Sequence, residues 1–327
     1  MAASGLALAV AATLRPSNRP KQSPHSCACL LDRRGEALPE LLPENRFPTR
    51  IGSHQHHVCN YHFEAKAAAL RDFSMAVFTQ DNASSRHETA VSLALAALIL
   101  LAWLCVHLAS IFFVDWSMAG RIFLAPVVIA VQCWLSVGLF IVAHDTMHGS
   151  LAPQYPRLNR TIGRFCVFIY AGFSYDKLFE SHHAHHRHPG TADDPDFDAD
   201  HPSRFWPWYL TFFRRYFGWR EFGILTVAVL VYLLILRERF PTMLVFWALP
   251  AILSSIQLFY FGTFLPHRAE EEPFTDRHRA RSNDFSPIMS LLTCFHFGYH
   301  HEHHDRPGVP WWRLPEQREA ALRAKAS

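Results

Sequence analysis

Two long runs of uncharged, mostly apolar residues restrict the fold of this chain more than any other feature. Residues 89–114 contain no Asp, Glu, Lys or Arg. A helix of that length reaches about 39 Å at a rise of ~1.5 Å per residue, more than the ~30 Å hydrocarbon core of a bilayer. Residues 122–143 form a second such run, which ends directly before His144. Both runs predict transmembrane helices.

Later apolar runs complete the predicted membrane topology. Residues 241–266 predict another crossing, and residues 222–236 predict a shorter one that needs snorkelling ends or a locally thin membrane. Residues 165–175 are too few to cross and are typical of an interfacial or re-entrant segment. Aromatic residues mixed with arginines at 205–220 favour the level of the lipid headgroups. We therefore expect an all-α integral membrane protein with about four transmembrane helices plus interfacial helices.

Composition supports this class and excludes others. Half of the residues are hydrophobic, yet the mean hydropathy is +0.02, so apolar runs must be segregated from polar segments. The net charge of +3 is small and scattered, which argues against a nucleic-acid partner. Seven cysteines without a C-x2-C pair predict no disulfide framework, zinc ribbon or iron-sulfur cluster.

The N-terminal region has the composition of an organellar transit peptide. Residues 1–31 contain no Asp or Glu and are rich in Ala and Ser. A secretory signal is a weaker interpretation, and a disordered tail is the third. The predicted organisation is a transit or disordered segment at 1–45, a polar segment at 46–88, a membrane domain at 89–315 and a tail at 316–327. A plastid membrane is the location that this organisation favours.

Histidines gather in spaced patterns near the ends of the apolar runs. On a helix, an H-x2-H-H pattern or an i, i+4 pair points its imidazoles into one sector, where they can converge on a metal. A single pair is usually a surface coincidence, but three patterns beside membrane-length runs predict a site. The patterns are His144 and His148; His182, His185 and His186; and His300, His303 and His304.

With His267, directly after the last apolar run, these residues make nine neutral nitrogen donors. Nine are too many for one four-coordinate zinc, so two metals sharing them is the economical solution. Imidazole suits zinc, copper, iron and nickel alike, but a position at the lipid boundary favours a redox metal. An even number of crossings places all nine on one membrane face. That face has more Lys and Arg near the spans than the opposite face, which predicts that it is cytosolic or the organellar equivalent.

Carboxylates lie close to these histidines in the sequence. Each can accept the second N–H of a ligand imidazole and fix its orientation. For the three aspartates around Pro195, a solvated turn is an equally good explanation. The carboxylates are Asp145, Asp193, Asp194, Asp196, Glu302 and Asp305.

These motifs resemble those of the membrane-bound histidine-box di-iron oxygenases, the superfamily of fatty acid desaturases and hydroxylases. The histidine boxes alone identify only the superfamily. The segments Leu265-Pro266-His267 and Trp311-Trp312-Arg313-Leu314-Pro315 are similar to those of the β-carotene ketolases of algae and bacteria. The likeness extends from about residue 89 to 315.

The resemblance implies a set of functional residues. The nine histidines would hold two non-haem iron ions, with His267 as the lone ligand outside the boxes. Asp145 would be the acidic, candidate catalytic residue of the first box, placed behind the ligands. His183 and His301 stand where ketolases often carry another residue, which leaves room for an exchanged ligand. His188 and His296 are expected to orient ligands or to pack beside them.

The reaction implied by the resemblance is O2-dependent oxidation of the C4 methylene of a β-ionone ring to a ketone. β-Carotene would give echinenone and canthaxanthin, and zeaxanthin would give astaxanthin. The chain has no G-x-G-x-x-G fingerprint for a flavin or nicotinamide. Electrons are therefore expected from a separate donor, such as a ferredoxin in a plastid.

Other functions fit part of the pattern. A β-carotene 3-hydroxylase or a fatty acid desaturase or hydroxylase would share the boxes but not the ketolase-like segments. A membrane metal transporter would also be rich in histidine. Its ligands should lie within facing spans to form a path, whereas here they lie at the ends of spans.

Overall fold

The computed structural model describes residues 86–118, 120–235, 237 and 239–326. Within these ranges the chain forms helices and loops and contains no strand, which confirms the all-α prediction. The predicted transit segment at 1–45 lies outside the described residues. So does the predicted polar segment at 46–88, except for its last three residues.

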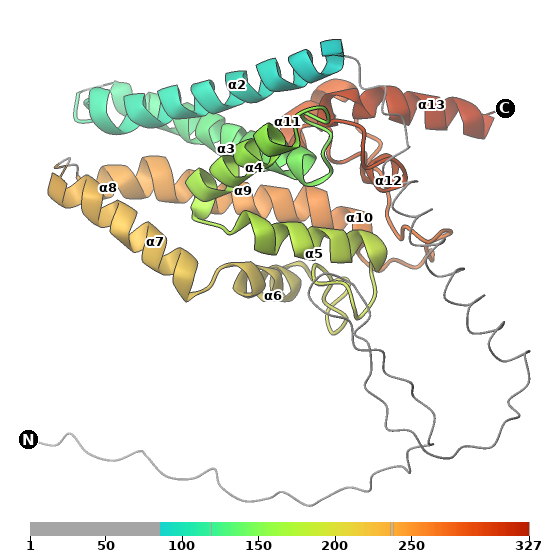
Figure 1. The fold of residues 1–327 in the computed structure, drawn as a ribbon. Coiled ribbons are helices and arrows are strands. Elements are labelled where there is room, and N and C mark those ends of the chain that lie inside the picture. Colours follow the sequence, from blue (N-terminus) through green and yellow to red (C-terminus); the bar gives the residue numbers. More distant parts are fainter. Residues whose placement is uncertain (1–85, 119, 236, 238, 327) are drawn as a thin grey trace, which may run out of the picture. The chain divides into compact units, whose positions relative to one another are not determined.

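Two antiparallel helices correspond to the first two predicted spans. α2 (Arg86–Leu108) continues into η1 (Ala109–Phe113), and η2 (Arg121–Leu124) leads into α3 (Ala125–Met147). The continuous helices Arg86–Phe113 and Arg121–Met147 are each long and apolar enough to cross a membrane. They pack against each other along the bundle (Figure 1).

The last predicted span is one long helix assembled from consecutive segments. From Phe240 to His267 this helix is also long and apolar enough to cross a membrane. It packs against α3. π-Helical turns interrupt its α-helical hydrogen bonding at two places. The segments are α8 (Phe240–Met243), η4 (Leu244–Ala248), α9 (Leu249–Phe259), η5 (Tyr260–Phe264) and α10 (Leu265–His267).

The predicted third crossing takes a different form from a straight span. α6 (Phe205–Tyr216) is followed by α7 (Trp219–Leu230) and η3 (Val231–Ile235), and the two halves meet at an angle of 77°. The bend arises because Gly218 leaves the helical conformation and its N–H donates to the Glu221 carboxylate at 3.0 Å. This cap starts a new helix in a new direction.

The bent pair still carries the chain to the far end of the bundle. Tyr232 of η3 stacks on Trp247 of η4 with ring centroids 5.2 Å apart. Trp116, in the turn between α2 and α3, stacks on Phe246 at 4.0 Å. The α2–α3 and α7–α8 turns therefore share one end, and the C-terminal ends of α3 and α10 meet at the other (Figure 1).

Two shorter helices follow α3 without crossing. α4 (Pro156–Ala171) packs on α3 and leaves Phe165 and Phe168 half exposed, as expected of an interfacial helix. It ends at Gly172, whose φ of 69° suits glycine at a helix C-terminus. α5 (Tyr175–Arg187) then begins behind the Ser174 cap.

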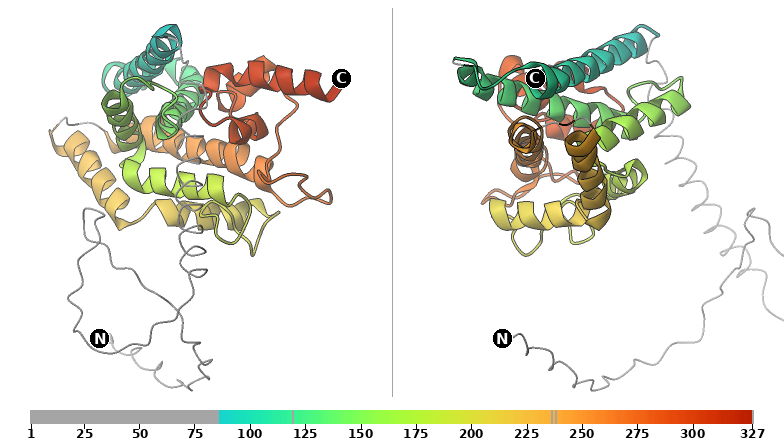
Figure 2. Two further views of the ribbon diagram at one scale, coloured as in Figure 1. Left: turned by 45° about the vertical axis from the view of Figure 1, so that its right-hand side comes forward. Right: turned by 90° about the vertical axis from the view of Figure 1, so that its left-hand side faces the viewer.

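The C-terminal segment is tied to the first two helices. It comprises α11 (Pro287–Cys294), α12 (His300–Asp305), η6 (Trp311–Arg313) and α13 (Leu314–Ala326). Trp312 Nε1 donates to Ser92 Oγ at 3.0 Å, and Arg313 pairs with Glu88. Figure 2 shows these helices in red beside the α2–α3 pair. The predicted tail at 316–327 thus falls largely on α13.

Gly163 offers a test of the α3–α4 contact. A Cβ at this position would lie 2.0 Å from Thr146 Oγ1 and 2.4 Å from Tyr175 Cε2. We expect Gly163→Ala to lower the apparent melting temperature in detergent, because overpacking typically costs about 1–3 kcal/mol. Gly223→Ala is the control, since a Cβ there meets nothing within 4 Å. Equal melting temperatures for the two variants would contradict this packing.

Candidate metal centre

The structure gathers the nine predicted histidines into two adjacent groups. Within each group, one ring nitrogen from every member lies within 4.8 Å of those of the others. We call them the five-histidine group and the four-histidine group. The first consists of His144, His148, His182, His186 and His303, and the second of His185, His267, His300 and His304.

The short helices α5 and α12 each divide their histidines between the two groups. Sequence reasoning expected the three imidazoles of an H-x2-H-H pattern to converge on one metal, and that detail is wrong. On a helix, positions i and i+4 are about 40° apart, whereas i+3 lies about 60° to the other side. His182 and His186 therefore join one group, and His185 joins the other. α12 repeats this arrangement.

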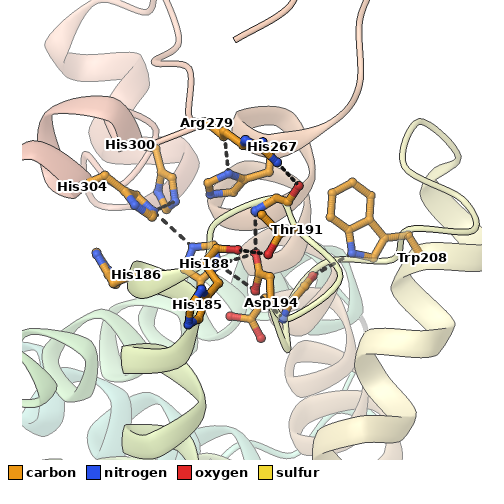
Figure 3. A network of polar contacts seen from close by, with 12 residues as sticks. His185, His186, His188, Thr191, Asp194, Trp208, His267, Arg279, His300 and His304 are labelled. Carbon is orange, nitrogen blue, oxygen red and sulfur yellow. Dashed lines mark hydrogen bonds and ion pairs between the residues drawn. The ribbon is translucent and has the colours of Figure 1, made fainter. Parts of the chain in front are cut away.

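Ring nitrogens face one another at short distances inside the groups. His148 Nε2 and His182 Nε2 are 2.7 Å apart. His304 Nε2 lies 3.1 Å from both His185 Nε2 and His300 Nε2 (Figure 3). In a neutral imidazole, one nitrogen carries the N–H and the other a lone pair. His304 Nε2 therefore cannot form a full hydrogen bond with both of the nitrogens that it faces.

The donor set fits bound cations. Among the described residues, Nε2 of His144 and Nε2 of His267 are buried and have no hydrogen-bond partner. His144 belongs to the five-histidine group and His267 to the four-histidine group. Buried polar atoms normally find a partner. A metal ion at the centre of each group would satisfy both of these nitrogens and their neighbours.

Burial keeps most of the ligand candidates neutral, as metal binding requires. Burial, with a contribution from neighbouring imidazoles, lowers the pKa of His148 to about 3. The same causes hold the pKa values of five others well below the ordinary value. They are His182, His186, His300, His303 and His304.

His185 is the exception because it has an acidic partner. Burial opposes protonation of His185, but the hydrogen bond and charge of Asp194 outweigh burial and raise the pKa of His185. Its Nδ1 lies 2.9 and 3.0 Å from the two carboxylate oxygens of Asp194. Asp194 also accepts the backbone N–H groups of Gly190 and Asp196, both at 2.8 Å. This loop fixes the ring of His185 (Figure 3).

His267 is oriented by a backbone group instead. Its Nδ1 donates to the carbonyl oxygen of Arg279 at 2.7 Å, which directs Nε2 toward the four-histidine group (Figure 3). Sequence reasoning missed this partner. A backbone carbonyl can come from any residue type, so no motif marks it.

Asp145 lies beside the five-histidine group and is not a member of either group. Its carboxylate is buried and accepts the backbone N–H of Trp311 at 3.0 Å. The second oxygen lies 3.9 Å from His144 Nδ1. Asp145 thus holds the C-terminal segment against α3 at the point where the first histidine projects.

The other histidines near the boxes lie outside both groups. His183 Nδ1 donates to a backbone carbonyl one turn earlier at 2.9 Å. His301 Nε2 lies 2.6 Å from Asp276 Oδ2. His296 stacks on aromatic neighbours, and His188 is exposed.

The remaining carboxylates serve other contacts or face solvent. Glu302 is buried and pairs with Arg318 at 3.0 Å and with Ser282, so it anchors α13 to α12. Asp193 and Asp305 are exposed. Of the three aspartates around Pro195, Asp194 is the one whose hydrogen bond to a candidate ligand is seen. Asp196 accepts from the Tyr216 hydroxyl, and one of its carboxylate oxygens lies within 4.8 Å of His185 and Asp194 ligand atoms.

A mainly aromatic cavity reaches both histidine groups. His144 and His182 of the five-histidine group line it, as do His185 and His300 of the four-histidine group. The cavity runs between α3, α5, α6 and the last long helix. Its apolar walls include Phe140, Met147, Phe173, Leu178, Phe212, Phe213, Leu258, Phe259 and Phe297.

The chain matches the fatty acid desaturase family over residues 121–228 and 213–326, a region that contains every candidate ligand. It is also similar to curated proteins named β-carotene ketolase. Those from two strains of Paracoccus sp. are 54% and 52% identical and align with 70% and 72% of this chain and with 93% and 96% of their own lengths.

An algal relative shows the same likeness at lower identity. The β-carotene ketolase of Haematococcus lacustris is 40% identical over 58% of this chain and 61% of its own length. The chain therefore belongs to the fatty acid desaturase family and, within it, to the β-carotene ketolases.

Proposed function

We propose that this chain is a carotenoid 4-ketolase, which uses O2 to oxidise the C4 methylene of a β-ionone ring to a ketone. The observation that carries the proposal is the aromatic cavity that ends on two groups of largely buried histidines. Such a cavity suits a long apolar substrate entering from the bilayer. The 54% identity to a β-carotene ketolase supports the choice of substrate.

We further propose a non-haem di-iron centre at the two histidine groups. The five-histidine group would hold one iron and the four-histidine group the other, because each offers at least four nitrogen donors. Imidazole donors suit a redox-active metal, and the family match supports iron. Bound there, the iron pair would supply the oxidising power that O2 chemistry at the ring methylene needs.

The protein's own contribution is to position the ring and to keep water away. The aromatic cavity walls confine the ring, and His144 and His300 line the cavity where it meets the two groups. C4 is allylic to the ring double bond, so its C–H bonds are weaker than those of the other ring methylenes. Two successive oxygenations at C4, each using one O2, two electrons and two protons, give a gem-diol that loses water. Exclusion of bulk water limits side reactions during these steps.

Electrons would come from an external donor. The chain carries no G-x-G-x-x-G fingerprint for a nucleotide cofactor of its own, which supports a separate donor. We propose a ferredoxin, because it is a donor that fits the proposed plastid location. The histidine groups lie at the ends of α3 and α10, where the spans leave the lipid. A water-soluble donor can approach that face.

The helices that are long and apolar enough to cross a bilayer make this a membrane protein. We propose a plastid membrane and a cleaved transit peptide, on the basis of the acid-free, Ala- and Ser-rich residues 1–31. An algal ketolase is among the similar proteins. The two Paracoccus relatives are bacterial, so the N-terminal composition is the main support for the plastid.

The proposed function predicts a specific pigment. Expression in bacteria that accumulate β-carotene should yield echinenone and canthaxanthin, which pigment chromatography separates from 3-hydroxylated products. A strain carrying the empty vector is the control. Iron-loaded protein that produced only 3-hydroxy carotenoids would identify a hydroxylase instead, and metal flux in vesicles would point to a transporter.

Single ligand substitutions test the two iron sites. We expect His303→Ala and His304→Ala each to lose about one of two bound iron ions per chain, because each removes a donor from a different group. His301→Ala is the matched control on the same helix, since its ring bonds to Asp276. Elemental analysis of the purified protein measures the iron. Equal iron loss in all three variants would contradict the proposed assignment.

Asp194 tests the orientation of His185. Asp194→Asn removes the charge that holds the ring, and loss of such a partner typically weakens metal binding about 10–100-fold. The iron retained against a graded series of chelator concentrations measures the effect. Asp193→Asn, at an exposed neighbouring position, should bind iron like the wild type. Matching retention curves for the two variants would remove Asp194 from the site.

A further inference from the structure

Phe297 forms the part of the cavity wall that touches both histidine groups. Its ring centroid lies 4.5 Å from that of His144 and 5.0 Å from that of His303 in the five-histidine group. It lies 4.9 Å from that of His300 in the four-histidine group. Phe297 also lines the cavity and is 8% exposed. A ring entering the cavity meets this side chain where the two groups adjoin.

The backbone before Phe297 is held in an uncommon conformation. Phe295 and His296 have φ values of 49° and 63°, a region that bulky residues rarely adopt and that often marks functional sites. Phe295 stacks on Trp134 at 4.4 Å and contacts Trp311 edge to face at 5.2 Å. These contacts lock the turn between α11 and α12, and the turn directs Phe297 toward the histidines.

Gly262 packs against one edge of the Phe297 ring. A Cβ at Gly262 would lie 3.0 Å from Cδ1 and 3.2 Å from Cε1 of Phe297. Gly262 belongs to the π-helical turn η5 and also lines the cavity. π-Helical turns occur frequently at functional sites. The Phe297 ring is therefore confined by the histidines and by a helix that has no side chain at the contact.

We propose that Phe297, set in place by Gly262, is a specificity-determining residue that decides how well a 3-hydroxylated β-ionone ring is accepted beside an unsubstituted one. This inference rests on the proposed ketolase function. C3 is bonded to C4, so a 3-hydroxyl group enlarges the ring next to the reacting carbon. Space at that point is limited by the side chain that adjoins both histidine groups, and Phe297 occupies this position.

The test compares conversion of the two substrates in one variant that should raise the ratio of zeaxanthin to β-carotene conversion and one that should lower it. Wild type, Phe297→Leu and Gly262→Ala are expressed in bacteria that make either β-carotene or zeaxanthin, and 4-keto products and bound iron are measured. Phe297→Leu should raise the ratio of zeaxanthin to β-carotene conversion about 10-fold, the lower limit for small changes in pocket volume. Gly262→Ala should lower that ratio, because its Cβ pushes the Phe297 ring into the cavity.

A double variant and a control make the result decisive. In Gly262→Ala/Phe297→Leu the added Cβ fills space that the smaller side chain frees, so the ratio should return toward that of the wild type. Phe246→Leu removes the same volume from a buried site at the far end of the bundle and should leave the ratio unchanged. If Gly262→Ala fails to accumulate, the double variant alone decides, and a ratio equal to that of Phe297→Leu would overturn the role of Gly262.

Failure of this inference can be told from failure of the proposed function. A wild-type chain that makes no 4-keto product in either strain rejects the ketolase function. A wild-type chain that makes keto carotenoids, with an unchanged substrate ratio in an iron-containing Phe297→Leu variant, rejects the role of Phe297 alone.

Discussion

The structure depends on keeping most of nine imidazoles neutral in a largely buried space where their nitrogens face one another. Burial lowers the pKa of candidate ligands such as His148 and His303, which preserves the lone pairs that a metal needs. Without a cation, crowded nitrogens such as His144 Nε2 would be buried without a partner, a costly arrangement. Metal binding and folding of this end of the bundle are therefore expected to be coupled.

The membrane helices bring these groups together from distant parts of the chain. α3 and the last long helix run in the same direction and end at the same face, so His148 and His267 are delivered from the lipid side. The short helices α5 and α12 complete both groups from the polar side. Each of these helices places its i and i+4 histidines in one group and its i+3 histidine in the other. The spacing between the two groups is therefore set by the positions of these residues within one helical turn.

A shell of contacts around the histidines determines where the cavity meets them. Asp194 and the Arg279 carbonyl orient one ligand each, while Asp145 ties the C-terminal segment to α3. The same segment carries the strained turn that places Phe297 against both groups. Ligand orientation and the shape of the cavity thus share a common support, which links metal binding to the choice of substrate.

Much of this site could be predicted because its determinants are local. Uncharged runs specify helices that cross a bilayer, and spaced histidines at their ends specify nine donors on one face. Tertiary structure decided which helices combine their donors in one group, since His303 joins His148 across more than one hundred and fifty residues. It also selected Asp194 rather than Asp193 as a partner of His185 and placed Phe297 against both groups. These features arise from packing between distant segments, which residue type and local spacing do not encode.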